Sequence, residues 1–281
     1  MSRAGGNVTE RSEPAWQPDE VWIDEGAVGP KETADQGTRA RRGNAGPAPV
    51  GARDRAGREP VPTGESSQGA HRHTVPRPVV DELSDAAGKA RGARLAARLA
   101  EATHAYDRER YQDARRILRA LADEVPKSAA VQELYGLVLY RSGQWAAAAA
   151  RLERYRTLTG AYDQHPVLAD SYRAQRRYDD AERLWDELRE ASPDADLVAE
   201  GRIVAAGVRA DQGDLAGAVA LLERSLRRVD RPGERHLRQW YVLADLAERA
   251  GDLPRARAIF AKVAAAEPDA YDVTERLRAL R

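Results

Sequence analysis

One short plan of residues occurs five times in the sequence, and this repetition limits the possible folds more than any other feature. In one copy, Gly136 is followed by a turn glycine at position 143, by Ala148 and by Leu152. The first and third of these residues are small, and the last is large and apolar. The other copies place the two small residues and the large one at Ala102, Ala114 and Leu118; Ala169, Ala181 and Trp185; Ala206, Ala218 and Leu222; and Ala244, Ala256 and Phe260. Successive copies begin 34, 33, 37 and 38 residues apart.

This plan predicts a pair of antiparallel helices in each copy. Helices approach closely only where small residues face one another, so Gly136 and Ala148 would mark a helix crossing. The large residue one turn later, such as Trp185 or Phe260, would fill the space toward the next pair. Each pair is apolar on one side and has to bury that side against its neighbours. The expected fold class is therefore all-α, with helical pairs stacked into a solenoid.

Turn residues separate the helices within this plan. Glycines at positions 143, 213 and 251 suit the left-handed residue that ends a helix, and the aspartates that follow the last two, Asp214 and Asp252, are placed to cap the next helix. A proline closes the second helix in three copies, at Pro126, Pro193 and Pro268. The plan is not followed everywhere. Glu109 and Arg176 replace the turn glycine, and Gly160 and Asp230 replace the closing proline.

Apolar spacing and these turn residues together give the expected helices. They lie near 93–108, 111–124, 128–141, 144–158, 165–175, 178–191, 195–211, 214–229, 234–249, 252–266 and 269–280. Residues 79–90 could add a short leading helix, although Gly88 and Gly92 interrupt the pattern. The last helix has Leu277 and Leu280 on one side and charges on the other, which suits a cap on the open end of a solenoid.

The pattern resembles the tetratricopeptide repeat (TPR), a helix-turn-helix unit of 34 residues with small and bulky residues at this spacing. The copy from Trp240 to Pro268 is the most similar, because it also has the early tryptophan. The resemblance covers roughly residues 95 to 281 and implies a right-handed superhelix. Its repeats would lie near 95–128, 129–161, 162–198, 199–236 and 237–270, followed by a cap at 269–281.

The first 80 residues differ in composition from the rest of the chain. They contain 11 glycines, 9 prolines and 22 charged residues but few apolar ones. Such a segment cannot bury enough apolar surface to offset the entropy lost on ordering. We therefore expect a disordered N-terminal arm at 1–80, followed by the solenoid at 81–281.

One stretch of this arm, residues 13–25, is different. It combines Trp16, Trp22 and Ile23 with five acidic residues and no basic one. Acidic segments that contain aromatic residues commonly fold when they bind a partner. The alternative is that these are chance apolar residues in a linker.

The resemblance also implies a function, the binding of a partner protein. TPR solenoids bind peptides or partner helices on a concave face, which the first helix of each repeat lines. First-helix residues that are not used for packing become candidate contacts, and they are Thr103, Tyr106, Glu133, Leu137, Tyr140, Arg141, Asp170, Arg173, Ile203, Tyr241, Asp245 and Arg249. The alternative is that the tyrosines fill the core between repeats and the charges are only solvated.

One subclass of TPR partner is not expected here. Repeats that clamp the C-terminal carboxylate of chaperones use lysine and asparagine at set positions of the concave face. This sequence carries Leu99, Thr103, Leu134, Asp163 and Val167 there, so the cationic cradle is missing.

Composition argues against several other classes of function. The 45 basic and 45 acidic residues balance, whereas a nucleic-acid or anionic-membrane binder would show a basic excess. Cysteine is absent, so the chain has no thiolate metal site and no thiol nucleophile. The histidines of the chain have no further metal ligand, nucleophile or phosphate-binding loop near them in the sequence. We expect no catalytic, cofactor-binding or metal-binding residues, and hence no enzyme.

The same composition gives an expected location and origin. The longest apolar run is only six residues, Trp145 to Ala150, too short for a signal peptide or a membrane span, so the cytoplasm is the expected location. Arginine outnumbers lysine 41 to 4 and alanine is abundant, which is typical of a high-GC bacterial genome.

Two functional hypotheses follow. The first is a non-enzymatic adaptor whose concave groove binds a peptide or helix of a partner. The alternative is a regulatory or assembly protein that acts through Trp16, Trp22 and Ile23, with the solenoid displaying or masking the arm. A related hypothesis has the arm dock on the chain's own concave groove and shield it.

Overall fold

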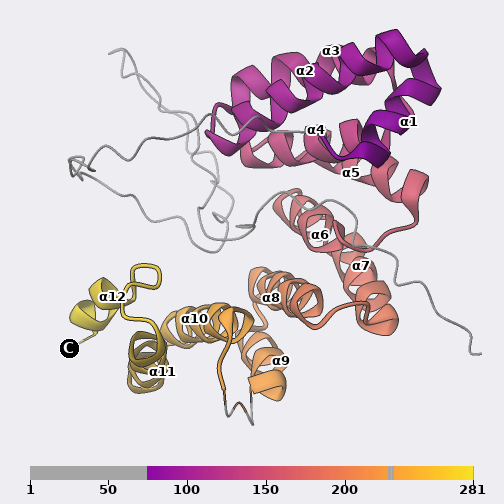
Figure 1. Cartoon of the computed structure of the whole chain (residues 1–281). Helices are drawn as coiled ribbons and strands as arrows, with labels where there is room; N and C mark the ends of the chain where they lie inside the picture. The colour runs from indigo at the N-terminus through magenta and orange to yellow at the C-terminus, as the bar shows by residue number, and fades with distance from the viewer. Residues whose placement is uncertain (1–74, 227–228, 230, 281) are drawn as a thin grey trace, which may run out of the picture.

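The computed structural model describes residues 75–226, 229 and 231–280, and these residues form twelve α-helices without a β-strand among them (Figure 1). The helices are α1 (Arg77–Ala87), α2 (Lys89–Asp107), α3 (Tyr111–Glu124), α4 (Ala129–Arg141), α5 (Trp145–Thr159), α6 (His165–Ala174), α7 (Tyr178–Ala191), α8 (Ala195–Asp211), α9 (Leu215–Leu226), α10 (Glu234–Arg249), α11 (Leu253–Ala266) and α12 (Val273–Ala279). The expected arm and its Trp16, Trp22 and Ile23 lie outside the described residues, apart from the stretch that contains α1.

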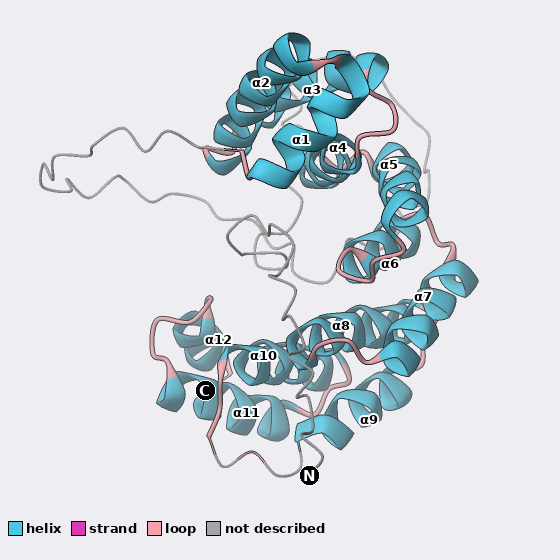
Figure 2. Cartoon of the chain, turned by 45° about the vertical axis from the view of Figure 1, so that its right-hand side comes forward, coloured by secondary structure: helices cyan, strands magenta, loops and turns pink. Residues whose placement is uncertain are grey.

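Five consecutive helical pairs stack into a curved solenoid, as the repeat plan predicts. The pairs are α2 with α3, α4 with α5, α6 with α7, α8 with α9 and α10 with α11. In Figures 1 and 2 the helices α6, α8 and α10 follow the inner side of the curve, and α7, α9 and α11 follow the outer side. We call the first helix of each pair an inner helix and the second an outer helix.

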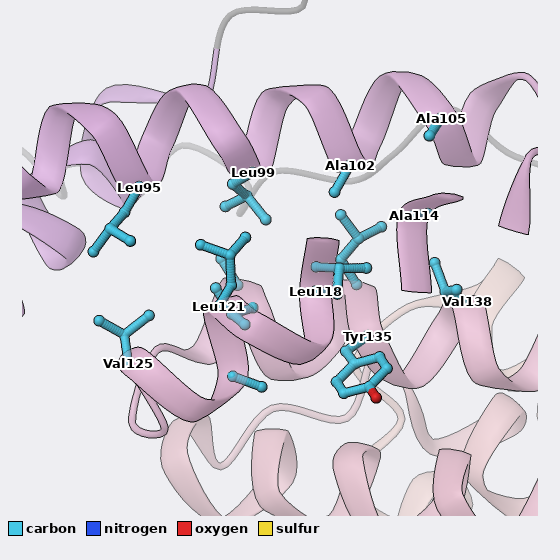
Figure 3. Close-up of a cluster of buried hydrophobic side chains, with 14 of the residues drawn as sticks. Leu95, Leu99, Ala102, Ala105, Ala114, Leu118, Leu121, Val125, Tyr135 and Val138 are labelled. Carbon is cyan, nitrogen blue, oxygen red and sulfur yellow. The ribbon is translucent and has the colours of Figure 1, made fainter. Parts of the chain in front are cut away.

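Small residues lie where the paired helices cross. Ala102, Ala114, Ala148, Ala206, Ala218, Ala244 and Ala256 are each 0% exposed. Figure 3 shows Ala102 of α2 lying close to Ala114 and Leu118 of α3, with Leu99 and Leu121 beside them. A Cβ atom at Gly136 would lie 2.6 Å from Cδ2 of Leu152, so any larger residue at that crossing would have to displace the Leu152 side chain. The predicted crossing points are confirmed.

The ends of the inner helices share one backbone conformation. Glycines at 143, 213 and 251 have φ of 70°, 90° and 82°, and Glu109 and Arg176 adopt the same left-handed conformation at 58° and 59°. Asp214 and Asp252 cap the helices that follow them, because their Oδ1 atoms accept hydrogen bonds from the backbone N–H groups of Gly217 and Arg255. The turn position therefore keeps one geometry through all five repeats, although its residue type changes.

The two ends of the solenoid differ from the expected boundaries. The leading helix α1 forms, and α2 begins at Lys89 rather than near 93. Gly88, with φ of 81°, turns the chain between them, and a Cβ at Gly92 would lie 2.5 Å from the Cα of Ser84. At the other end α12 is shorter than expected and begins at Val273, after Tyr271 in a left-handed conformation with φ of 53°.

None of the helices in the described part of the chain combines the length and apolar character that a bilayer span requires.

Candidate functional site

Polar side chains join three consecutive inner helices. Tyr140 of α4 donates its hydroxyl hydrogen to Oδ2 of Asp170 in α6, at 2.6 Å. Arg173 donates from Nε to Oδ1 of Asp170 at 2.7 Å and from Nη1 to Oδ2 of Asp211 in α8 at 2.9 Å. Arg173 is only 7% exposed, and burial together with the Asp170 carboxylate raises the pKa of the Tyr140 hydroxyl well above its usual value. The three helices are therefore held in a fixed relative position.

The same kind of contact attaches the C-terminal helix. Tyr241 of α10 donates to Oδ1 of Asp272 at 2.5 Å. Arg276 of α12 reaches back to Oδ1 of Asp245 at 2.8 Å and to Oε2 of Glu248 at 2.7 Å. Helix α12 thus occupies the place of a sixth inner helix and covers the last pair, as the expected cap should.

Near the other end, tyrosine rings cluster around one arginine. Nε of Arg141 donates to the hydroxyl oxygen of Tyr111 at 3.1 Å, and the rings of Tyr106 and Tyr111 meet edge to face with centroids 5.8 Å apart. Burial raises the pKa of Tyr106 to about 12, so its hydroxyl stays protonated at a pH where an exposed tyrosine would ionise. Tyr106, Tyr140 and Arg141 remain only partly buried and form an aromatic and basic edge on the inner helices.

The structure divides the twelve expected contact residues by exposure. Five are buried, namely Thr103, Glu133, Leu137, Arg173 and Ile203. Six are partly buried, namely Tyr106, Tyr140, Arg141, Asp170, Tyr241 and Asp245, and Arg249 is exposed. Leu137 and Ile203 belong to the hydrophobic core, so these two side chains are used for packing, contrary to the expectation from register.

Glu133 belongs to a buried polar cluster behind the inner surface. Its Oε1 accepts a hydrogen bond from Nε2 of Gln164 at 2.8 Å, and Asp163 lies close enough to repel its charge. Tyr155 donates to Oδ2 of Asp163 at 2.7 Å. Burial first, and then the Asp163 carboxylate, raises the pKa of Glu133 to about 8. No group of three or more His, Asp or Glu side chains in the described residues could hold a metal ion.

Five residues of these links were not among the expected contacts: Tyr111, Asp211, Glu248, Asp272 and Arg276. Each lies 28 to 38 positions from its partner in the chain, close to one repeat length. A search for opposite charges or tyrosine–carboxylate pairs at that spacing would have included these residues among its candidates, but the relative rotation of the repeats decides which candidates meet.

A match to one known protein family agrees with the repeat pattern that the crossing points and turns indicate. The model of the tetratricopeptide repeat family matches residues 99–166, 167–207 and 204–271, which together cover more than half of the chain. The chain belongs to the tetratricopeptide repeat family. This family is characterised by helical solenoids that mediate protein–protein interaction.

Two solved structures share this TPR fold. A thermophilic TPR protein of Thermus thermophilus is 19% identical, with a TM-score of 0.53 over 65% of this chain and 96% of that one. A TPR protein of Parabacteroides merdae is 15% identical, with a TM-score of 0.53 over 72% of this chain and 78% of that one. At these identities the likeness concerns the fold alone. No curated protein matches this sequence, and these similarities do not test the expected high-GC origin.

Proposed function

We propose that this TPR protein is a non-enzymatic adaptor that binds a peptide or a helix of a partner protein along its inner helices. The observation that carries the proposal is the chain of contacts from Tyr140 through Asp170 and Arg173 to Asp211, which fixes α4, α6 and α8 relative to one another. A surface that is already ordered loses little conformational entropy on binding, and more of the contact energy then appears as affinity.

Exposure narrows the proposed contact surface to seven residues. They are the partly buried Tyr106, Tyr140, Arg141, Asp170, Tyr241 and Asp245 and the exposed Arg249. The five buried residues of the original set would support this surface from behind. Tyrosine and arginine are enriched in protein interfaces, where they contribute large contact area and directed hydrogen bonds. Since acidic and basic groups both occur here, the proposed partner segment carries charges of both signs.

Site-specific photo-crosslinking in the full chain tests this proposal. A photoreactive residue replaces Arg249 on the inner helix α10 in one variant and Arg119 on the outer helix α3 in its control, since both side chains are exposed. We expect a partner from the native source to crosslink at position 249 and not at 119. Crosslinking at 119 alone would place the binding surface on the outer helices and refute the proposal.

A second pair of variants separates this proposal from the alternative in which the arm is the binding element. Trp16→Ala and Trp22→Ala in the full chain leave the inner helices unchanged. We expect these variants to crosslink the partner from position 249 as the parent does. If crosslinking were lost, the alternative function through Trp16, Trp22 and Ile23 would replace the adaptor proposal.

A further inference from the structure

A hollow of about 520 Å³ lies on the outer side of the solenoid, between α7 and α9. Figure 2 shows these two helices following one another on the outer side, with α8 on the inner side of them. Ion pairs bridge the neighbouring gaps between outer helices, from Arg156 of α5 to Glu187 of α7 and from Glu223 of α9 to Arg255 of α11. In the part of the chain that the structure describes, no ion pair joins α7 to α9.

The hollow exists because the fourth repeat lacks a large side chain at one register position. Ala205 of α8 forms part of its floor. The equivalent positions of the second, third and fifth repeats carry Tyr135, Leu168 and Leu243, all of them large and buried. Repeat four therefore has the smallest of these four side chains where the hollow lies.

The lining of the hollow is both basic and apolar. Four arginines, Arg189, Arg202, Arg209 and Arg224, surround it together with only two acidic side chains, an excess of two positive charges in a chain whose net charge is zero. Trp185, Ala205 and Leu221 supply the apolar part. A volume of this size lies within the range of about 300–1,000 Å³ found for binding pockets.

Among the arginines that line the hollow, Arg202 is the clearest example of a cation without an acidic partner in the described part of the chain. Its guanidinium lies 5.7 Å from the centre of the Trp185 ring, and Nη1 donates to Oε1 of Gln239 at 3.2 Å. Among the described residues it forms no ion pair, and desolvation lowers its pKa. Arg224 likewise forms no ion pair with any described residue. A carboxylate that entered the hollow would find cations that are not already held in an ion pair.

We propose that residues 13–25 of this same chain occupy the hollow. This segment has the complementary chemistry, since its five acidic residues surround Trp16, Trp22 and Ile23 and it contains no basic residue. Its carboxylates would pair with Arg202 and Arg224, and an indole ring would pack on Leu221 and under an arginine. The proposal does not depend on partner binding by the inner helices, because it concerns the opposite side of the solenoid.

The length of chain before α1 allows this contact. About 50 residues separate the segment from Val75, and they can extend to about 170 Å, whereas an unstructured chain of that length spans about 40 Å on average. Successive packed helices are spaced about 10 Å apart, so the seven steps from α1 to α8 amount to at most about 70 Å. The segment can therefore reach the hollow while tethered, which raises its local concentration to roughly the millimolar range.

Distance measurement between two spin labels in the full chain tests the proposal directly. The native sequence has no cysteine, so Gln17→Cys in the segment and Glu182→Cys at the rim of the hollow give one label each. Docking gives a narrow population of short distances between positions 17 and 182. A broad distribution with no short component would overturn the proposal. A control with the second label at Arg119→Cys on α3 should give a longer distance than position 182.

Two further variants identify the contact that holds the segment. Ala205→Leu places in the hollow the side chain found at positions 168 and 243, and should abolish the short distances while thermal unfolding stays near that of the parent. Arg202→Glu with Arg224→Glu should also abolish them, and adding Asp19→Arg with Glu20→Arg should restore them by exchanging the charges. Short distances that survive both Ala205→Leu and the charge reversal would refute docking in this hollow.

Dilution with unlabelled protein tests whether the docked segment and the hollow belong to the same chain. In the doubly labelled protein mixed with an excess of unlabelled protein, docking within one chain leaves the short distances unchanged. Their loss on dilution would show that the arm of a second copy occupies the hollow, which contradicts the proposal.

Discussion

Ionisation of Glu133 would lower the stability of the folded protein. Its side chain is 5% exposed, and Gln164 gives it one hydrogen bond while Asp163 opposes its charge. Its pKa is about 8 in the folded protein against an ordinary value of 4.5. Between these two values the folded state keeps the proton and the unfolded state loses it. The free energy of unfolding therefore falls as pH rises through this window.

We expect Glu133→Gln to remove this pH dependence. Below about pH 4.5, where the carboxyl is protonated in both states, the variant and the wild type should unfold at similar temperatures. From there to about pH 8 the wild type should lose stability relative to the variant, by a few kcal/mol at the upper end. Thermal unfolding across this range measures the difference, with Glu182→Gln as a control at an exposed carboxylate. A constant difference at all pH values would show that Glu133 ionises normally.

The turn between paired helices keeps its backbone conformation even where its residue type changes from glycine. Glu109 and Arg176 adopt the left-handed conformation of the equivalent glycines because the following helix still has to reverse direction in the same number of residues. An L-residue in that conformation costs about 1–2 kcal/mol, which the packing of the helical pair offsets. The spacing of the small residues predicted these turns even where glycine was absent.

Paired helices depend on the small residues at their crossings. Ala148 of α5 is 0% exposed, and Ala150 two residues later is exposed on the same helix. We expect Ala148→Glu to destabilise the fold by about 4 kcal/mol or more, because an unpaired charge enters the core. Ala150→Glu, the same change on the solvent side, should stay within about 0.5 kcal/mol of the wild type. Equal denaturant midpoints for the two variants would contradict the register of the repeats.

The cap helix α12 depends on one arginine. Arg276 pairs with Asp245 and Glu248 of α10 and stacks over the ring of Phe260, 4.9 Å from its centre. Arg276→Ala leaves two partly buried carboxylates without their donor, so we expect a loss of about 1–3 kcal/mol and faster hydrogen exchange in α12. Arg278→Ala, at an exposed position of the same helix, should change neither. If both variants exchanged at the parent rate, the ion pairs would not be what holds the cap.

Element boundaries were predictable where glycine, aspartate or proline marks them, and less so at the ends of the solenoid. Gly88 and Gly92 looked like interruptions of a leading helix, but the first turns the chain and the second allows α1 to lie against α2. The shorter α12 follows from the left-handed Tyr271, which no sequence pattern indicated. At Gly92 the decisive factor is a contact with a neighbouring helix, and at Gly88 and Tyr271 it is a left-handed backbone conformation.

At the scale of the whole molecule, the sequence predicted the solenoid but not how the repeats attach to one another. The pairing of Tyr140 with Asp170, and of Arg173 with Asp211, crosses between repeats and therefore depends on their relative rotation. The same limit applies to the outer hollow. The significance of Ala205 comes from its position at the hollow between α7 and α9, which only the structure shows.

Hydrogen exchange of the full chain, with and without the partner isolated by crosslinking at position 249, tests most directly where the protein binds. We expect the partner to slow exchange in the C-terminal parts of three inner helices, at 103–107, 137–141 and 241–249, which carry six of the proposed contact residues. Exchange in the outer helices α3, α5, α9 and α11 should stay at the rate of the free protein. Protection confined to these outer helices, with none in the three inner segments, would contradict binding by the inner face of the solenoid.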